Sequence, residues 1–340
     1  MHHNPQIKVK IILHLYAGFR RRGGVGDFIY AFNNVNDISL LVVPIDIVSE
    51  NARHNILDPA NFKHFLTLIH NGVVIGVLAG PPCETWSASR HREVEGRKGP
   101  RPIRSTLLPF GMQRCSHKEL TQVDVGNLLL TIAFRLFCEM IATRGFALIE
   151  HPADAGPQFA SIFKLPITQR LLAIPVVRKE TFAQGLLGQI SPKPTSILTL
   201  RLPGFSKLYS NLKTNIMPPP LPQLDAENRF ATAAAKTYQP RFCSLIAAMI
   251  LDTVHKTRLD TLRHAYFMRE VVSKYKSMLL EYEAADPSTS DLDFIPHGIN
   301  DSDIPSSVLP LLDWHATEHS YGADYHGPLP SSSSLRPSNL

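Results

Sequence analysis

A short apolar run that ends in a rigid turn constrains the fold of this chain most strongly. Residues 73–79 are uncharged and rich in β-branched side chains, as in strands buried on both faces of a parallel sheet. Pro81 and Pro82 stiffen the following turn, which presents Cys83. Because ligand sites in open α/β sheets form at the carboxyl ends of the strands, the turn would place a thiol at such a site. The alternative is a buried cysteine that acts as a small hydrophobe.

The rest of the pattern also favours an α/β fold. Apolar runs predict strands at 7–16, 40–43, 73–79, 147–152, 174–177 and 196–200, and helical periodicity predicts helices at 59–70, 128–141, 166–173, 241–254 and 259–285. A strand, a helix and a strand joined by short links imply parallel pairing with a right-handed crossover. We therefore expect a mostly parallel sheet with helices on both faces.

Composition sets the outer limits. A chain of 340 residues with 44% hydrophobic content can bury one domain of about 250 residues plus an appendage. The absence of a run of about 18 apolar residues and the polar start predict a soluble, intracellular protein. The four cysteines are Cys83, Cys115, Cys138 and Cys243. They are too scattered for a disulfide framework or a zinc site. Cys138 and Cys243 lie on apolar helix patterns, so we expect them in the core.

Positive charge is concentrated just after Cys83. The net charge of +6 permits an anionic partner, although many proteins with such an excess bind no nucleic acid. The stretch 90–104 holds Arg90, Arg92, Arg97, Lys98, Arg101 and Arg104 against Glu93 and Glu95. A basic loop beside a thiol could clamp the phosphates around a target base, and the alternative is an ordinary solvated loop.

Four segments resemble cytosine-5 DNA methyltransferases in the right order. Residues 80–83 read Gly-Pro-Pro-Cys, followed by Trp86 and Ser87, and resemble the family's nucleophile loop of Gly-Pro-Pro-Cys-Gln, an aromatic residue and Ser. Residues 147–152 resemble its strand ending in Glu-Asn. Residues 182–195 resemble the stretch ending in Lys-Pro-Thr, and residues 233–243 resemble the closing element.

This sequence departs from the family at several of those positions. Glu84 replaces the Gln of the nucleophile loop, and His151 replaces the Asn after the family's glutamate. The family's Gln-x-Arg-x-Arg strand has no clear counterpart near residues 177–180. Arg178 or Arg90 could take the place of its arginines. The segment between Lys-Pro-Thr and the closing helix is also short for a domain that recognises a DNA sequence. These departures suggest a divergent member of the family, of mobile-element or phage type.

The resemblance also implies a site for S-adenosylmethionine. Ala17 and Gly18 follow the first strand and resemble the family's Asp-Leu-Phe-x-Gly-x-Gly loop, with His14 at the acidic position. Nucleotide-binding α/β folds often hold ribose hydroxyls with an acid after the second strand, which favours Asp46 here, with Glu50 in reserve. The expected cofactor residues are Tyr16, Ala17, Gly18, Asp46, Asp58 and Pro81. Asp58 could instead cap the helix at 59–70, and Asp46 could be a solvated loop carboxylate.

The activity implied by the resemblance is methylation of cytosine C5 in DNA, with RNA as a lesser option. Cys83 would add to C6 as a thiolate, and Glu150 would brace the N3 and amino edge of the base. The base would be flipped out of the duplex, and Ser87, Arg90, Arg97, Lys98 and Arg101 would contact the nucleic acid. No metal is required.

The resemblance also suggests a division of the chain. Residues 1–256 would form a Rossmann-like methyltransferase domain with a recognition insert near 201–230. Residues 257–285 would be a C-terminal helix, and the Ser, Pro and Asp content of 286–340 predicts a disordered tail. Residues 204–224 read as a linker. In a eukaryotic cell such an enzyme would act in the nucleus.

Two other functions stay open from the sequence. A catalytically silent methyltransferase fold would bind nucleic acid or a partner protein, and the irregular loop at 18–27 favours this reading. A thiol hydrolase would pair Cys83 with His91 or His151, but no Asn or Asp that could orient the histidine is evident.

Overall fold

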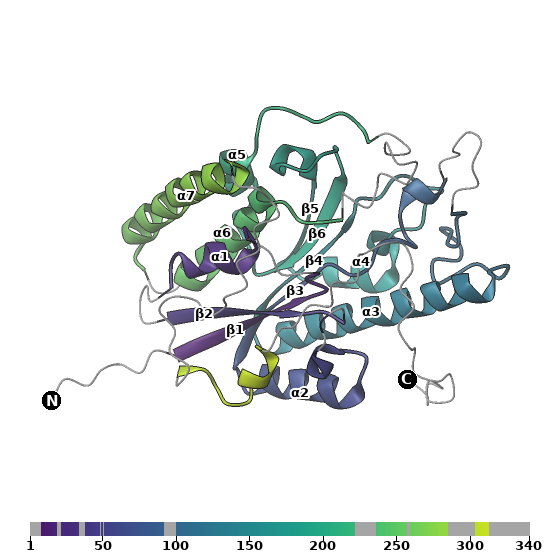
Figure 1. Ribbon diagram of the computed structural model, residues 1–340, viewed down its shortest axis with the longest axis horizontal. Coiled ribbons are helices and arrows are strands. Elements are labelled where there is room, and N and C mark those ends of the chain that lie inside the picture. Colours follow the sequence, from purple (N-terminus) through teal and green to yellow (C-terminus); the bar gives the residue numbers. More distant parts are fainter. Residues whose placement is uncertain are drawn as a thin grey trace.

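The computed structural model describes residues 8–18, 22–33, 38–47, 49, 51–91, 100–221, 236–256, 259–284 and 303–312. These residues form a six-stranded sheet in the order β2-β1-β3-β4-β6-β5, with helices packed around it (Figure 1). The strands are β1 (Lys8–Leu15), β2 (Ile38–Ile45), β3 (Val74–Ala79), β4 (Phe146–Pro152), β5 (Val177–Ala183) and β6 (Pro194–Leu200). The helices are α1 (Val25–Tyr30), α2 (Pro59–His70), α3 (His117–Ala142), α4 (Pro166–Leu172), α5 (Phe205–Leu212), α6 (Pro240–Lys256) and α7 (Thr261–Ala284).

The sheet is mostly parallel, as expected. β2, β1, β3 and β4 pair in parallel, whereas β6 runs antiparallel to both of its neighbours, β4 and β5. The chain passes from β1 to β2 on one side of β1 and then returns to β3 on the other side. The connections therefore diverge between β1 and β3, and a crevice at the carboxyl ends of these strands is the usual ligand site of such a sheet.

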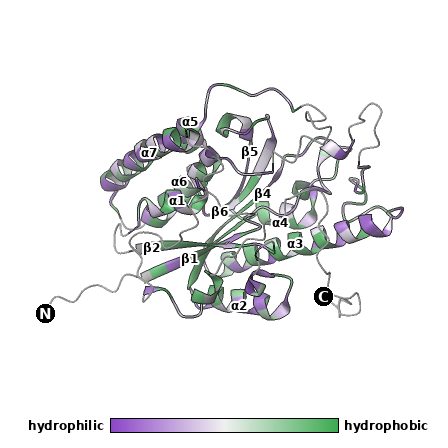
Figure 2. Ribbon diagram, in the orientation of Figure 1, coloured by the Kyte–Doolittle hydropathy of each residue, from purple (hydrophilic) through white to green (hydrophobic). Residues whose placement is uncertain are grey.

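Helices cover both faces of the sheet, which confirms the predicted layers. α2, α3 and α4 pack on one face through side chains such as Phe65 and Phe137, and α1, α5, α6 and α7 pack on the other through Phe28 and Ile246. Figure 2 shows apolar strands between helices whose outer sides are more polar. Because successive side chains of a strand point to opposite faces, β1 sends Ile11 to one core and Ile12 to the other.

α3 is the long helix that links β3 to β4. Ser116 and Glu119 form a reciprocal capping box at its first turn, which satisfies backbone N–H groups that the helix itself leaves unpaired. By length and composition alone, α3 is apolar enough to cross a membrane, but 56% of its most apolar window is buried inside the protein. It packs against β3 and β4 as a core helix.

Two sequence expectations between β4 and α6 are wrong. The strand expected at 174–177 begins only at Val177 and continues to Ala183, because it lies at the edge of the sheet, where polar residues face solvent and break the apolar pattern. The expected linker at 204–224 contains α5, whose Leu208 and Leu212 are buried against α6. This part of the predicted recognition insert therefore belongs to the core.

The described parts of the C-terminal quarter also pack onto the sheet domain. The Tyr275 hydroxyl of α7 donates to the carbonyl of Phe28 in α1 at 2.7 Å. Residues 303–312, which the sequence assigns to a disordered tail, bury Val308 and Leu311 in the core on the α2 side, because apolar side chains recur within the polar stretch. The rest of 286–340 lies outside the described residues.

Candidate active site

The turn after β3 presents Cys83 at the carboxyl end of the sheet. The Gly80 N–H donates to the carbonyl of Leu15 at 3.4 Å, which ties the turn to β1, and the Trp86 N–H donates to the carbonyl of Cys83 at 2.9 Å. Cys83 is half-buried. Burial, followed by the negative charges of Glu84 and Glu150, raises the pKa of its thiol to about 12. The thiol is therefore protonated at neutral pH in this conformation.

Glu150 lies next to this turn because of the register of the parallel strands. Ala79 of β3 pairs with Ile149 of β4, so Gly80, the first residue after β3, lies next to Glu150, which is still in β4 and pairs with Ile197 of β6. The Glu150 side chain is buried, with 7% of its surface exposed. Its charge contributes to the raised pKa of Cys83, so the structure brings together the two residues expected to be catalytic.

Both oxygens of Glu150 accept hydrogen bonds from buried donors. The side-chain amide of Gln184 donates to Oε1 at 2.9 Å, and the Tyr238 hydroxyl donates to Oε2 at 2.8 Å. Burial, followed by the charge of Glu150, raises the pKa of Tyr238 well above its ordinary value, so the phenol remains a neutral donor. The two donors hold the carboxyl group in one orientation.

The segment before α6 is fixed to the Cys83 turn at a second point. Lys236 forms an ion pair with Glu84 through an Nζ–Oε1 distance of 3.0 Å. The positive charges of Lys236 and Lys193 partly offset the rise in the pKa of Cys83. Sequence reasoning did not assign a role to Gln184, Tyr238 or Lys236. Only the resemblance of residues 182–195 and 233–243 to family elements pointed to these segments.

The expected cofactor residues cluster in part at the ends of β1 and β2. Asp46 is buried, and its Oδ2 accepts the backbone N–H of Gly18 at 2.8 Å. Gly18 has a φ of +68°, and nothing lies within 4 Å of a Cβ built on it. Tyr16 also has a positive φ of 58°, and its hydroxyl donates to the carbonyl of Leu129 at 2.7 Å. Because the Gly18 N–H already donates to Asp46, what these strand ends offer a ribose is a buried carboxylate acceptor beside open space at the glycine.

The other cofactor candidates lie elsewhere or have structural roles. Asp58 is the N-cap of α2, and its Oδ1 accepts the N–H groups of Ala60 and Asn61. Pro81 is buried in the turn before Cys83, and Ala17 is half-buried beside Gly18. Glu50 lies outside the described residues.

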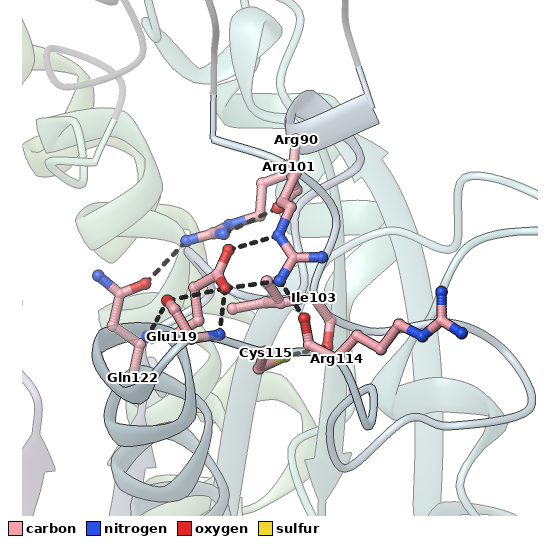
Figure 3. Close-up of polar contacts among 8 residues, drawn as sticks. Arg90, Arg101, Ile103, Arg114, Cys115, Glu119 and Gln122 are labelled. Atoms are coloured by element: carbon pink, nitrogen blue, oxygen red, sulfur yellow. Dashed lines mark hydrogen bonds and ion pairs between the residues drawn. The ribbon is translucent and has the colours of Figure 1, made fainter.

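The described ends of the basic stretch bind the protein itself. Figure 3 shows Arg90 and Arg101 converging on the first turns of α3. The Arg101 guanidinium forms two 2.8 Å contacts with Glu119, and Arg90 donates to the carbonyls of Glu84 and Arg101 and to Gln122. Ser87 bonds locally to Ser89. Arg97 and Lys98 lie outside the described residues, so their contact with nucleic acid stays a prediction.

Arg104 is not a surface residue of this stretch. Only 2% of it is exposed, and its guanidinium donates to side-chain oxygens of Thr85 and Asn127 and to the carbonyls of Val123 and Pro109. Burial, followed by the positive charge of Arg90, lowers its pKa to about 10, so it still carries a charge at neutral pH. The expectation that the whole stretch 90–104 is a solvated, phosphate-binding loop is therefore wrong at this end.

The solved structures that align with this chain include two methyltransferases. An Entamoeba histolytica methyltransferase, EhMeth, aligns with 64% of this chain and 60% of its own, at 14% identity and a TM-score of 0.31. A candidate DNA modification methyltransferase encoded within a prophage of E. coli aligns with 62% of this chain and 52% of its own, also at 14% identity and a TM-score of 0.31. The chain thus spans less than two thirds of either structure, and at this similarity the alignments assign no function. No family model and no curated protein matches the chain.

The histidines near the Cys83 turn pack against aromatic rings. His151 lies between Trp86 and Phe163, and neither ring nitrogen has a hydrogen-bond partner among the described residues. Burial lowers its pKa to about 3, so it stays neutral. His91 contacts Phe159 edge to face, with ring centroids 4.7 Å apart. Among the residues that the structure describes, neither histidine has the acidic orienting partner that a Cys–His hydrolase uses.

Proposed function

We propose that this protein methylates C5 of cytosine in DNA with S-adenosylmethionine. The observation that carries the proposal is the register of β3 and β4, which sets the Cys83 turn beside Glu150, a buried carboxylate with a fixed orientation. A nucleophile and a proton-exchanging group at the carboxyl ends of β3 and β4, next to the switch point of an α/β sheet, suit a reaction on one face of a flat ring.

The chemistry explains why both residues are needed. C5 of cytosine is too electron-poor to attack a methyl donor unaided. When the sulfur of Cys83 bonds to C6, the C5–C6 double bond opens and C5 becomes nucleophilic. In its protonated form Glu150 donates its proton to N3, where negative charge develops, and its other oxygen accepts from the amino group. After methyl transfer, a base removes the C5 proton, the double bond re-forms and the sulfur leaves.

Cys83 requires activation before it can add. A thiol with a pKa of about 12 has little thiolate at neutral pH, and the thiolate is the nucleophile. Glu84 raises that pKa, whereas Lys193 and Lys236 lower it. The proposal therefore requires that substrate binding changes these surroundings or supplies an acceptor for the thiol proton.

Binding of the cofactor is assigned to the ends of β1 and β2. Asp46 would accept hydrogen bonds from ribose hydroxyls, and the open space over Gly18 would let the ligand approach the backbone closely. When bound there, S-adenosylmethionine supplies an electrophilic methyl group. The substrate strand would run past the stretch 90–104, with the target base turned out of the stack.

The deciding experiment traps the covalent complex. DNA that contains 5-fluorocytosine should form a stable adduct with the protein, because fluorine cannot leave as a proton and elimination stalls. Cys83→Ser should abolish the adduct, Glu150→Gln should slow its formation, and Cys115→Ser should leave it unchanged as the matched control. Methylation that persists in Cys83→Ser would refute the mechanism.

The raised pKa of Cys83 favours a second candidate, a catalytically silent fold that binds nucleic acid or a partner protein. Calorimetry with S-adenosylmethionine separates the two. Binding of the cofactor, weakened by Asp46→Ala, supports the enzyme. DNA binding without cofactor binding or an adduct supports the silent fold.

A further inference from the structure

The phenol ring of Tyr238 fills a slot that is formed by Glu150, the Cys83 turn, His14 and Phe242. We propose that this slot is the binding site of the target base and that Tyr238 occupies it until a base enters. The inference rests on the proposed function, and it adds that the free protein is held in a self-blocked state. It also limits the ligand to a planar ring with an amino group on its edge.

The floor of the slot is backbone. A Cβ built on Gly80 would lie 2.1 Å from the Tyr238 hydroxyl oxygen and 3.2 Å from its ring carbon, so the ring rests directly on the turn that leads to Cys83. The negative charge of a Cys83 thiolate would contribute to the raised pKa of Tyr238, which also indicates that the two groups are close. A base that took the place of this ring would lie against the turn that carries the nucleophile.

The sides of the slot suit a flat aromatic ring. The imidazole of His14, at the end of β1, is nearly parallel to the Tyr238 ring, with an interplanar angle of 8° and centroids 6.4 Å apart. The ammonium of Lys193 lies 5.7 Å from the ring centroid, and Phe242 meets the ring edge to face at 5.0 Å. Stacking and cation–π contacts of this kind act on nucleobases as well as on phenols.

The edge of the slot selects a donor. The Tyr238 hydroxyl donates to Oε2 of Glu150, while Gln184 already donates to Oε1. An exocyclic amino group can replace the phenol as the donor to Oε2. A uracil or thymine ring would present a carbonyl oxygen to the carboxylate at that edge and would be repelled. The arrangement therefore points to an aminopyrimidine rather than any pyrimidine.

Self-occupation should weaken binding of the base by a predictable factor. The apparent affinity is the intrinsic affinity multiplied by the fraction of molecules with an open slot. Tyr238→Phe keeps the ring but removes its hydrogen bond to a charged group, which is enough to raise the open fraction by about tenfold. Tyr238→Ala removes the occupying ring itself and should raise the fraction of molecules with an open slot at least as much. If Tyr238 merely oriented Glu150, both changes would weaken binding of the base.

The test measures binding of single-stranded oligodeoxynucleotides by fluorescence anisotropy. The full-length protein carries Cys83→Ser in every sample, so that no covalent complex forms. Three probes of one sequence place cytosine, uracil or an abasic site at the centre, the remaining bases being thymine. Tyr238→Phe should tighten binding of the cytosine probe by about tenfold and leave the uracil and abasic probes unchanged. Tyr266→Phe, at an exposed tyrosine of α7, is the matched control and should change none of them.

Weaker or unchanged cytosine binding in Tyr238→Phe overturns the proposal, and equal tightening for all three probes overturns it as well. If Tyr238→Ala loses its helical circular dichroism, Tyr238→Phe alone decides. Failure of the proposed function is separate, because it appears in proteins with Cys83 intact as the absence of a 5-fluorocytosine adduct. If the adduct forms but Tyr238→Phe leaves binding of the cytosine probe unchanged, the self-blocked state is ruled out and the proposed enzymatic function still stands.

Discussion

The guanidinium carbon of Arg104 lies 4.1 Å from the centroid of the Trp86 ring. The same guanidinium bonds to Thr85 and, on α3, to Asn127. A buried cation thus joins the segment just after Cys83 to the longest helix of the protein. This contact fixes the base of the turn, although Arg104 touches neither expected catalytic residue.

Arg104→Leu should therefore destabilise the protein strongly. The change leaves the oxygens of Thr85 and Asn127 and two carbonyls, which are buried or half-buried, without their donor, and unpaired groups of this kind account for the large effects of single mutations. We expect the free energy of unfolding to fall by about 3 kcal/mol or more in urea titrations. Arg114→Leu is the control: this arginine is exposed, and its guanidinium points away from the network in Figure 3. A loss of similar size in both variants would contradict the assignment.

Gly80→Ala should separate Tyr238 from Glu150. The new methyl group would meet the Tyr238 hydroxyl at 2.1 Å, so the ring must move and the hydrogen bond must break. We expect a loss of about 1–3 kcal/mol in unfolding free energy. In the Tyr238→Phe background the same change should be much milder, since the clashing oxygen is gone. A double-mutant cycle on stability measures this coupling, and strictly additive losses would rule out the contact.

The sequence predicted the parts of this fold that depend on burial. The runs that became β1 to β4 are apolar because both faces of the sheet are covered, and the strand–helix–strand pattern through α3 led to the right parallel pairing. The edge strand β5 was misplaced, because one side of it faces water. The order of the strands and the insertion of β6 between β4 and β5 depend on long-range pairing that local patterns do not record.

The site was only partly visible in the sequence. The resemblance to a family's motifs brought out Cys83 and Glu150, and in the structure the charge of Glu150 acts on the Cys83 thiol. Gln184 and Tyr238, the two donors to Glu150, lie 34 and 88 residues away along the chain, so no local pattern links them to it. Arg104 was taken for a surface charge because it follows a basic stretch, and the four groups that accept its hydrogen bonds are not recognisable in the sequence around it.

The Arg101–Glu119 pair should make stability sensitive to acid. Hydrogen bonds from Arg101, then from Ser116, lower the pKa of Glu119 to about 2 from an ordinary 4.5. A lowered folded-state pKa adds stability that is fully present above pH 4.5 and is lost as the pH falls from 4.5 to 2. Glu119→Gln should therefore be less stable than the unchanged protein at pH 6 and approach it at lower pH. A constant gap between their urea midpoints from pH 6 to pH 3 would contradict this prediction.

Alkylation of Cys83 should report its raised pKa. Since only the thiolate reacts, the rate with iodoacetamide should rise about tenfold per pH unit beyond pH 9 without a plateau there. Glu84→Gln should speed the reaction at a given pH, because it removes a negative charge and frees the charge of Lys236 from its partner. Peptide mass spectrometry follows the label at this residue. A plateau near pH 9, or slower labelling in Glu84→Gln, would count against the described surroundings.

The packing of residues 303–312 has a consequence for how the chain is made. His54 contacts the carbonyl of Leu311 across 257 residues, and Phe28 accepts a hydrogen bond from Tyr275 across 247. Segments that leave the ribosome long after β1 and β2 therefore complete the helical layers next to these strands. Because N-terminal parts usually fold first during synthesis, the nascent protein must carry these layers incomplete until those segments emerge. A premature stop before residue 261 would release a chain with most of its sheet but with the side of α1 that normally meets α7 exposed, which makes it a substrate for chaperones and proteases.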